Sequence, residues 1–239
     1  MLRVLVPGGV NLKHENSDSL SATGEFYVAQ AAGQGDGFYT AFGKRAFDIV
    51  FAILLLPFLI PVIFMLWVLT VRDGGVGFYG HERIGKNGVR FQCWKIRSMV
   101  ANAEEKLTTY LKDNPEAAAE WASSQKLTTD PRVTRFGRIL RSTSLDELPQ
   151  IWNVLKGEMS FVGPRPVIAD ELLRYRHGKA TYLSLTPGIT GLWQTSGRND
   201  TSYDERVRFD ILYSHQISFR LDCLLIIKTA SAIFGRTGR

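Results

Sequence analysis

Two adjacent carboxylates, Asp146 and Glu147, follow a stretch in which arginine recurs at every third position. The arginines are Arg135, Arg138 and Arg141, and on a helix this spacing places them on one face. Neighbouring carboxylates can divide two tasks, because one can bind a hard cation while the other attacks an electrophile whose charge is neutralised. Paired carboxylates beside a row of cations are therefore suited to phosphoryl chemistry.

The same segment also fits a purely structural role. Ser144 and Glu147 have the spacing of a capping box, and Asp146 would be favourable near a helix N-terminus. Pro149 weakens this interpretation, because proline prefers the first helical turn and disfavours helix in the residue before it. A cap and an active site are compatible, so both interpretations stay open.

Two later segments offer further contacts for a phosphate. Pro164 and Pro166 hold the backbone of Arg165 extended, and a fixed guanidinium presents a rigid fork of donors. A Pro-Arg-Pro sequence is, however, more often an ordinary loop. Further on, the glycines of residues 186–194 predict a tight loop near a ligand, and Arg198 adds another cation.

An uncharged run from Ile49 to Val71, interrupted by Pro57 and Pro61, must place this chemistry at a membrane. At about 1.5 Å per residue, a helix of this length could cross a hydrocarbon core of roughly 30 Å. The prolines predict a bend instead, and basic residues at both ends give little reason for either end to cross. We expect a re-entrant hairpin that enters and leaves the same leaflet. A simple span and a buried core helix are the alternatives.

Composition narrows the class of partner. Lys and Arg outnumber Asp and Glu by 29 to 23, and the formal net charge of +6 favours a membrane surface, a phosphate or a nucleic acid. No segment clearly interleaves aromatic with basic residues, so we expect no nucleic acid. The two cysteines, Cys93 and Cys223, lack metal-ligand spacing and are compatible with a reducing cytoplasm.

Turn residues and helical patterns divide the whole chain into three parts. Residues 1–40 predict a flexible leader, 41–73 the re-entrant membrane helix and 74–239 a cytosolic catalytic domain. The fold class is α+β and helix-rich, with a membrane helix-hairpin, a short β-hairpin and interfacial amphipathic helices. Strands are predicted at 76–79 and 89–96, two surface helices within 99–125 with Pro115 at a helix start, further helices at 148–155, 168–175 and 203–217, and an interfacial helix at 217–234.

Taken together, the motifs resemble the bacterial sugar transferases that act as monotopic polyprenyl-phosphate phosphoglycosyltransferases. The resemblance runs from about Lys44 to the C-terminus and depends on the ordered set of motifs. The segments that carry it are Lys44 to Asp48, Trp94 to Met99, Thr128 to Thr134, Arg141 to Gln150, Asn153 to Ser160, Pro164 to Pro166 and Thr186 to Gly191. One departure is Leu56 before Pro57, where a well-studied type of member has serine, which leaves the hairpin angle open.

The resemblance implies an activity and its partners. It implies transfer of a sugar 1-phosphate from a UDP-sugar to undecaprenyl phosphate, with release of UMP and a requirement for Mg²⁺. The sugar would be galactose or glucose, and the reaction would be the first membrane step of exopolysaccharide or related glycan synthesis. The place implied is the cytoplasmic face of the bacterial inner membrane, and a homodimer is a candidate assembly.

The resemblance also implies roles for individual residues. Asp146 would be the nucleophile that forms a covalent phospho-sugar intermediate, and Glu147 would help to hold Mg²⁺. The residues expected to bind phosphate or support charge near the site are Arg141, Arg165, Lys95, Arg97 and Arg198.

Two other classes of protein fit parts of the sequence. A basic, membrane-docked binding protein would recruit anionic lipid or nucleic acid without catalysis. A structural partner of a polysaccharide-assembly complex would use Asp146 and Glu147 only as a helix cap. In that case Asp146→Asn would leave synthesis intact and change stability by about 0.5 to 2 kcal/mol.

Overall fold

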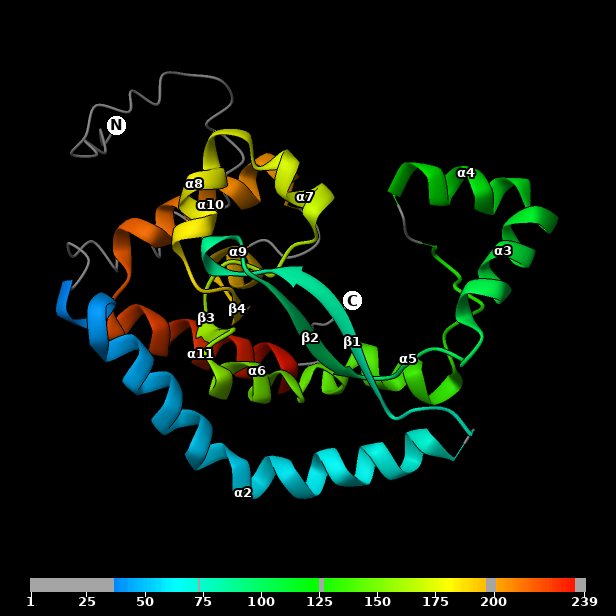
Figure 1. The fold of residues 1–239 in the computed structure, drawn as a ribbon, viewed down its shortest axis with the longest axis horizontal. Coiled ribbons are helices and arrows are strands. Elements are labelled where there is room, and N and C mark those ends of the chain that lie inside the picture. Colours follow the sequence, from blue (N-terminus) through cyan, green and yellow to red (C-terminus); the bar gives the residue numbers. More distant parts are fainter. Residues whose placement is uncertain (1–36, 73, 125–126, 197–200, 235–239) are drawn as a thin grey trace.

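The computed structural model describes residues 37–72, 74–124, 127–196 and 201–234 of the chain. Within this part the fold is rich in helix, with two small sheets near its centre and one long helix along one side (Figure 1). Residues 1–36 of the predicted leader lie outside the described residues. Along the chain, the helices and strands of the described part are η1 (Tyr39–Gly43), α2 (Lys44–Val71), β1 (Phe78–Ile84), η2 (Lys86–Gly88), β2 (Arg90–Ile96), α3 (Ala103–Asp113), α4 (Pro115–Ser124), α5 (Arg135–Ser142), η3 (Leu145–Glu147), α6 (Gln150–Lys156), β3 (Ser160–Val162), α7 (Ala169–Arg174), η4 (Arg176–Gly178), α8 (Lys179–Ser184), β4 (Gly188–Thr190), α9 (Leu192–Ser196), α10 (Tyr203–Gln216) and α11 (Phe219–Phe234).

Helix α2 continues through Pro57 and Pro61 and changes direction near its middle (Figure 1). A proline inside a helix removes one backbone donor and clashes with the preceding turn, which accounts for the bend. Among the described helices, one, spanning Tyr39–Val71, is long and apolar enough to cross a membrane. Only 11% of its most apolar stretch is buried, so α2 is not the core helix that was one alternative from the sequence.

Both ends of α2 nevertheless pack on the same globular body. Near its start, Asp48 accepts hydrogen bonds from the hydroxyl of Ser160 and the N–H of Phe161, each at 3.0 Å. Near its end, the carbonyl oxygen of Thr70 accepts a hydrogen bond from Arg97 at 3.2 Å. Large apolar side chains along the helix stay exposed, among them Val50, Ile53, Leu54, Phe58, Ile60, Phe64 and Met65.

Strands β1 and β2 form the expected antiparallel hairpin, with Phe78 opposite Ile96 and Ile84 opposite Arg90. The first strand, predicted at 76–79, ended too early, directly before Gly80. In the structure Gly80 lies within β1, where a Cβ would approach the side-chain oxygen of Gln92 to 2.9 Å. The strand therefore continues to Ile84 and brings additional side chains to the site.

A second sheet, the parallel pair β3 and β4, was not predicted from the sequence. A Cβ at Gly163 would collide with the carbonyl oxygen of Thr186, and one at Gly188 with the backbone nitrogen of Gly163. Only glycine permits this approach of two backbones. The N–H of Gly188 then donates to the carbonyl oxygen of Pro164 at 2.8 Å, which fixes the start of the Pro-Arg-Pro loop.

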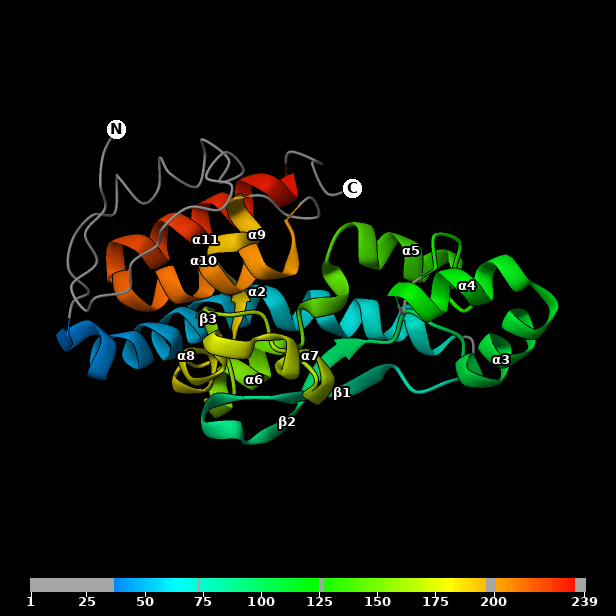
Figure 2. The same cartoon turned by 90° about the horizontal axis from the view of Figure 1, so that it is seen from above.

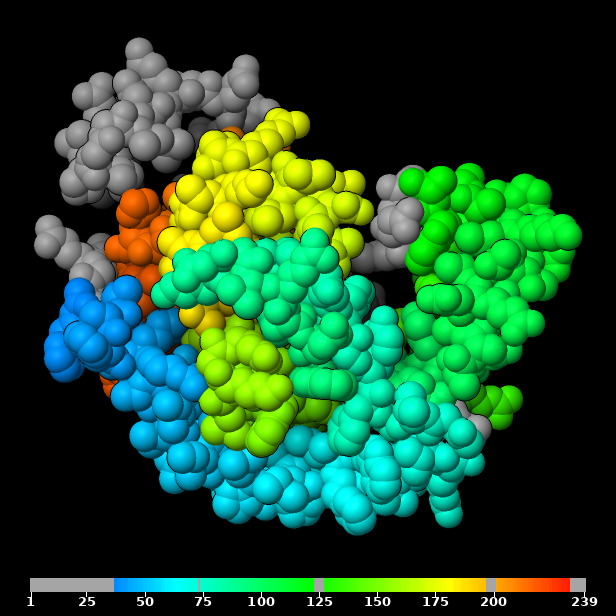
Figure 3. All heavy atoms as spheres, viewed as in Figure 1, coloured from blue at the N-terminus to red at the C-terminus, as the bar shows by residue number. Residues whose placement is uncertain are grey.

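The predicted helices are present with small changes in their bounds. Helices α3 and α4 confirm the pair of surface helices, with Pro115 at the first position of α4. This pair stands at one end of the molecule (Figures 1 and 2), and the face between it and the α7–α8 region is hollowed (Figure 3).

Helix α11 buries one face in the protein, while Phe219 and Ile227 stay exposed, so its predicted interfacial position stays a prediction. Its Leu221, Asp222 and Leu225 are buried, and Asp222 is completely enclosed. The carboxylate of Asp222 accepts hydrogen bonds from Lys44 at 2.6 Å, Tyr213 at 2.7 Å and Tyr39 at 2.8 Å. A buried charge with three donors is tolerated inside a protein. Asp222 therefore ties α11 to the start of α2.

Candidate active site

Asp146 and Glu147 lie on the 3-10 turn η3, between α5 and α6. Ser144, which precedes the turn, has a φ of 56° in the left-handed region, and its side chain makes no capping hydrogen bond. The capping-box interpretation is therefore wrong for Ser144. A left-handed conformation is uncommon for a residue other than glycine and is typical of tight functional turns. Here the left-handed residue stands directly before the turn that carries the two carboxylates.

The turn is held in place by apolar packing on both sides of the carboxylates. Leu145 and Leu148 pack against a buried cluster formed by Leu66 of α2, Ile96 of β2 and Leu140 of α5. Three elements far apart in the sequence therefore position Asp146 and Glu147. One of these elements is the second half of the long apolar helix.

The surroundings of the two carboxylates push their pKa values in opposite directions. Lys95 donates a hydrogen bond to Glu147 at 2.6 Å, and its Nζ lies 4.0 Å from Oδ2 of Asp146. Burial raises the pKa of Asp146 above its ordinary value, and the attraction of Lys95 opposes this rise only in part. Burial also disfavours ionised Glu147, but Lys95 and Arg165 outweigh it and lower the pKa of that carboxyl. Such divergence is typical of carboxylates with different chemical roles.

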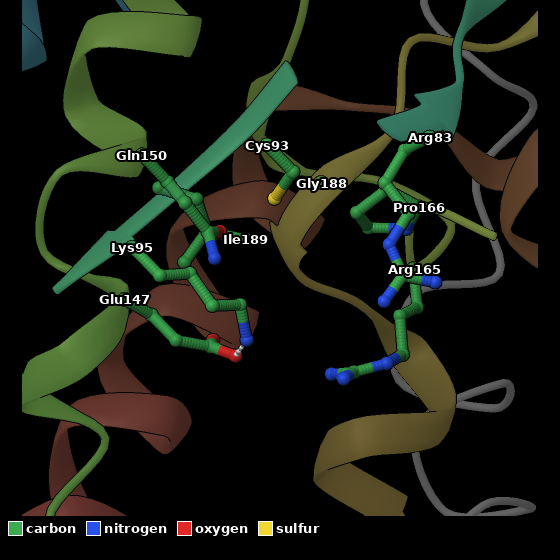
Figure 4. A pocket seen from close by; sticks show the side chains of 9 residues that line it. All are labelled: Arg83, Cys93, Lys95, Glu147, Gln150, Arg165, Pro166, Gly188 and Ile189. Atoms are coloured by element: carbon green, nitrogen blue, oxygen red, sulfur yellow. Dashed lines mark hydrogen bonds and ion pairs between the residues drawn. The ribbon is translucent and has the colours of Figure 1, made fainter. Parts of the chain in front are cut away.

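Lys95 and Glu147 line a small pocket, and Arg83 and Arg165 reach into it from the opposite side (Figure 4). Three cations thus face one carboxylate, which is an arrangement that favours a phosphate. Asp146 lies beside this lining, next to Lys95, rather than within it. The full lining is Arg83, Cys93, Lys95, Glu147, Gln150, Arg165, Pro166, Gly188 and Ile189.

The other cations predicted for the site have different positions. Arg141 is exposed at the end of α5, where its Nε donates to the hydroxyl of Ser98 at 2.9 Å. Its charge still lowers the pKa of Asp146, although less than burial raises it. Arg97 is buried and does not line the pocket. Arg198 lies outside the described residues.

Arg97 instead holds the backbone together. Its guanidinium donates to the carbonyl oxygens of Val76 at 2.6 Å, Thr70 at 3.2 Å and Met99 at 3.3 Å. These contacts join the end of α2 to the segments on either side of the hairpin. All three of these contacts of Arg97 are thus with the backbone, which indicates a structural role.

Of the lining residues, Lys95, Glu147 and Arg165 were named as site residues from the sequence; the ones not so named are Arg83, Cys93, Gln150, Pro166, Gly188 and Ile189, although Gly188 and Ile189 lie in the loop predicted to approach a ligand. A signal for Arg83 was present in the sequence. Side chains two residues apart on a strand share a face, and paired residues across a hairpin share it as well. With β1 extended to Ile84, Arg83 falls on the face that also carries Cys93 and Lys95.

Asp146 and Glu147 are the carboxylates that could serve as ligands for Mg²⁺ in the site. No group of three or more His, Cys, Asp or Glu side chains in the described part of the chain could hold a metal ion. Mg²⁺ is usually bound by one or two carboxylates together with phosphate oxygens and water. Asp146 and Glu147 supply that number of carboxylates, so the donor set fits an ion that arrives with a phosphate substrate. Lys95 already occupies one oxygen of Glu147 and would have to share it.

Comparison with known proteins gives consistent matches along the chain. The sequence model of the bacterial sugar transferase family matches residues 39–236. An undecaprenyl-phosphate galactose phosphotransferase from Salmonella typhimurium is 50% identical over 197 residues, covering 82% of this chain and 41% of the relative. The exopolysaccharide production protein ExoY from Sinorhizobium fredii is 46% identical over 218 residues, covering 91% of this chain and 96% of the relative.

A third relative, with lower identity, is also named as an undecaprenyl-phosphate sugar transferase. The UDP-glucose:undecaprenyl-phosphate glucose-1-phosphate transferase from Escherichia coli is 37% identical, covering 78% of this chain and 39% of the relative. The chain thus spans less than half the length of the Salmonella and Escherichia proteins, and nearly all of the Sinorhizobium protein.

Proposed function

Because the chain belongs to the bacterial sugar transferase family, we propose that it transfers a sugar 1-phosphate from a UDP-sugar to undecaprenyl phosphate. Relatives named as undecaprenyl-phosphate galactose and glucose transferases support this chemistry, and the ExoY relative supports a role in exopolysaccharide synthesis. The observation that carries the proposal is the pocket in which Arg83, Lys95 and Arg165 face Glu147, with Asp146 beside it. The release of UMP from a panel of UDP-sugars identifies the hexose that is transferred.

The proposed first step is attack by Asp146. One oxygen of its carboxylate forms a bond to the phosphorus that carries the sugar, and the bond from that phosphorus to the bridging oxygen breaks. The electron pair stays on the bridging oxygen, which leaves as part of UMP. The product is a phospho-sugar joined covalently to Asp146. In the second step, an oxygen of undecaprenyl phosphate attacks the same phosphorus and releases the carboxylate.

The main obstacle to this reaction is repulsion between a carboxylate and a diphosphate. Fixed cations that face the reacting phosphates reduce this repulsion and stabilise the transition state. Lys95 lies between the two carboxylates, and Arg165 approaches from across the pocket (Figure 4). Arg141 adds positive charge from the end of α5.

Mg²⁺ is proposed as the cofactor, with Glu147 as the residue that holds it. When bound, Mg²⁺ would neutralise charge on the diphosphate. The lowered pKa of Glu147 keeps this carboxylate ionised, which is the form that binds a cation. Asp146 remains available as nucleophile because only one carboxylate is required.

The membrane helix is proposed to be re-entrant, with the domain at the cytoplasmic face of the inner membrane. At the start of α2, Arg45 donates to the carbonyl oxygens of Val154 and Leu155 at 2.6 and 2.8 Å. At its end, Thr70 is bound by Arg97. A helix that crossed roughly 30 Å of hydrocarbon would move one of these ends to the opposite side of the bilayer. Contact of both ends with one domain therefore supports entry and exit on the same side.

The test is the release of UMP by the full chain held in a nanodisc. Undecaprenyl phosphate, Mg²⁺ and a panel of UDP-sugars are supplied, and we expect release with a galactose or glucose donor. Asp146→Asn should reduce the rate by about 10³-fold or more. Asp170→Asn, at an exposed position in the first turn of α7, is the matched control and should retain activity. No release by folded protein, or equal release by Asp146→Asn, would contradict the proposal.

A further inference from the structure

Arg83 is the pocket cation that the family motifs did not indicate. It points into the pocket beside Arg165, across from Lys95 and Glu147 (Figure 4). Its side chain is only 15% exposed. Two guanidinium groups repel each other, so other interactions must hold them together on one wall of the pocket.

A dedicated set of hydrogen bonds brings the two arginines to the same wall. The N–H of Ile84, next to Arg83, donates to the carbonyl oxygen of Val167 at 2.9 Å. The buried hydroxyl of Tyr182 donates to the carbonyl oxygen of Ile84 at 2.6 Å and accepts from the N–H of Val167 at 3.1 Å. The hairpin is thus tied to the chain directly after the Pro-Arg-Pro loop. Arg83 and Arg165 are therefore positioned together by the backbone.

The carboxylates near these two arginines do not fully neutralise their positive charge. Glu171 lies 3.5 Å from Arg83, but its side chain is 41% exposed and the contact is long. No described carboxylate lies within ion-pair distance of Arg165, and Glu147 is paired with Lys95. His81 lies 3.3 Å from Arg83, and burial together with the charge of Arg83 lowers its pKa, which favours the neutral imidazole; a histidine cannot supply the missing negative charge in either form. This wall is therefore suited to an anion supplied by a ligand.

The geometry of phosphoryl transfer shows which anion belongs there. The attacking and leaving oxygens lie roughly in line, on opposite sides of the phosphorus. On the proposed function, the attacking oxygen comes from Asp146, on the same side as Lys95 and Glu147. The leaving oxygen must then point to the opposite wall, where Arg83 and Arg165 lie (Figure 4).

We infer that Arg83 and Arg165 together bind the phosphate of the departing nucleotide, and that Arg83 is a substrate-binding residue on the donor side of the reaction. When the bridging oxygen takes the electron pair of the broken bond, its new charge develops against two guanidinium groups. Each can donate paired hydrogen bonds to phosphate oxygens. The inference rests on the proposed function and divides the pocket into an aspartyl side and a nucleotide side.

The inference is tested by the binding of UMP to the full chain in nanodiscs, measured by calorimetry without a donor sugar. Arg83→Gln should weaken UMP binding by about tenfold or more, because a charge-assisted contact is lost. Arg83→Lys, which keeps the charge but loses the fork, should bind UMP with an affinity between those of the wild type and Arg83→Gln. Binding of undecaprenyl phosphate by Arg83→Gln should match that of the wild type.

Two controls separate nucleotide binding from a structural role. Arg90→Gln removes an arginine from the same hairpin, where it pairs with exposed Glu82 at 2.8 Å outside the pocket. Glu171→Gln removes the acidic partner of Arg83. Both variants should bind UMP within about twofold of the wild type, and thermal unfolding of each variant reports whether it is folded.

Two outcomes would overturn the inference while leaving the proposed function intact. One is wild-type affinity for UMP in Arg83→Gln. The other is an equal loss of affinity in Glu171→Gln, which would mean that the Arg83–Glu171 contact acts only by supporting the fold. The proposed function is judged separately, by release of UMP from UDP-sugars in the wild-type protein.

Discussion

Asp146 and Glu147 are neighbours in the sequence but differ in their electrostatic surroundings. Burial raises the pKa of Asp146, whereas the cations Lys95 and Arg165 overcome burial at Glu147 and lower its pKa. A carboxylate that is poorly neutralised is a better nucleophile, and one that is always ionised is a better ligand for a cation. The division of roles proposed for the pair follows from these surroundings.

The pH dependence of the reaction tests the state of Asp146. Its carboxylate must be ionised to attack, so activity is lost as the pH falls through the pKa of the folded protein. Because burial raises this pKa, the acidic limb of the rate of UMP formation should lie above the ordinary aspartate value of 3.8. A limb at or below that value in the pH dependence of kcat/KM, which reports the free enzyme, would contradict this account.

The stability of Asp146→Asn gives a second test at this scale. A carboxyl whose pKa is raised on folding destabilises the folded protein once the pH exceeds that pKa. Asp146→Asn should therefore raise the unfolding temperature at neutral pH and have little effect at strongly acidic pH, as measured by thermal unfolding. A helix cap predicts the opposite, a loss of about 0.5 to 2 kcal/mol.

At this scale the sequence indicated much of the site. Asp146, Glu147, Lys95 and Arg165 were predicted, and the structure brings them together. Arg97 was expected near the site because the resemblance to the family implied it. The strand ends at Ile96, however, so the alternation that would place both side chains on one face stops there. Whether a cation faces a phosphate or backbone carbonyls depends on such ends.

At the scale of elements, Arg97 joins α2 to the β1–β2 hairpin. Arg97→Gln should lower the free energy of unfolding by about 2 kcal/mol, because three carbonyl oxygens, one in a buried and two in part-buried contacts, lose a charged donor. Denaturant unfolding measures this change. Arg135→Gln, at an exposed position on α5, is the control and should change stability by less than about 0.5 kcal/mol. Unchanged stability of Arg97→Gln with a greatly raised KM for the donor would instead place Arg97 in the site.

The helices and the hairpin could be predicted because each has a local pattern. The pair β3 and β4 could not, because strands of three residues show no periodicity and their pairing depends on two glycines far apart in the chain. The internal partner of Asp222 on α11 could not be predicted for a similar reason. Lys44, which pairs with Asp222, is 178 residues away in the sequence, so an internal ion pair looked like a surface charge.

At the scale of the whole molecule, the bent helix connects the membrane to the chemistry. Leu66 of α2 belongs to the same buried cluster against which Leu145 and Leu148 pack, on either side of the two carboxylates. A helix embedded in one leaflet would therefore hold Asp146 near the level of lipid headgroups, where a lipid phosphate lies. The net charge of +6 is favourable at an anionic membrane surface.

Labelling from each side of the membrane tests this arrangement. Cys93 and Cys223 are free and are first replaced by alanine. Single cysteines are then placed at Gly37 and Val76, on either side of α2, both of which are exposed. An impermeant maleimide should label both positions in inside-out vesicles and neither in right-side-out vesicles. Labelling of one position in each type of vesicle would show a simple span and contradict the re-entrant proposal.

The central claim is that Asp146 carries the phospho-sugar between donor and acceptor. The most direct measurement is to mix the nanodisc-held protein with Mg²⁺ and its UDP-sugar, leave out undecaprenyl phosphate, and quench rapidly. We predict a burst of about one UMP per chain, with a sugar phosphate added to the peptide that contains Asp146, and neither in Asp146→Asn. UMP that appears only after undecaprenyl phosphate is added, with no change in the mass of the protein, would show direct transfer and contradict the account.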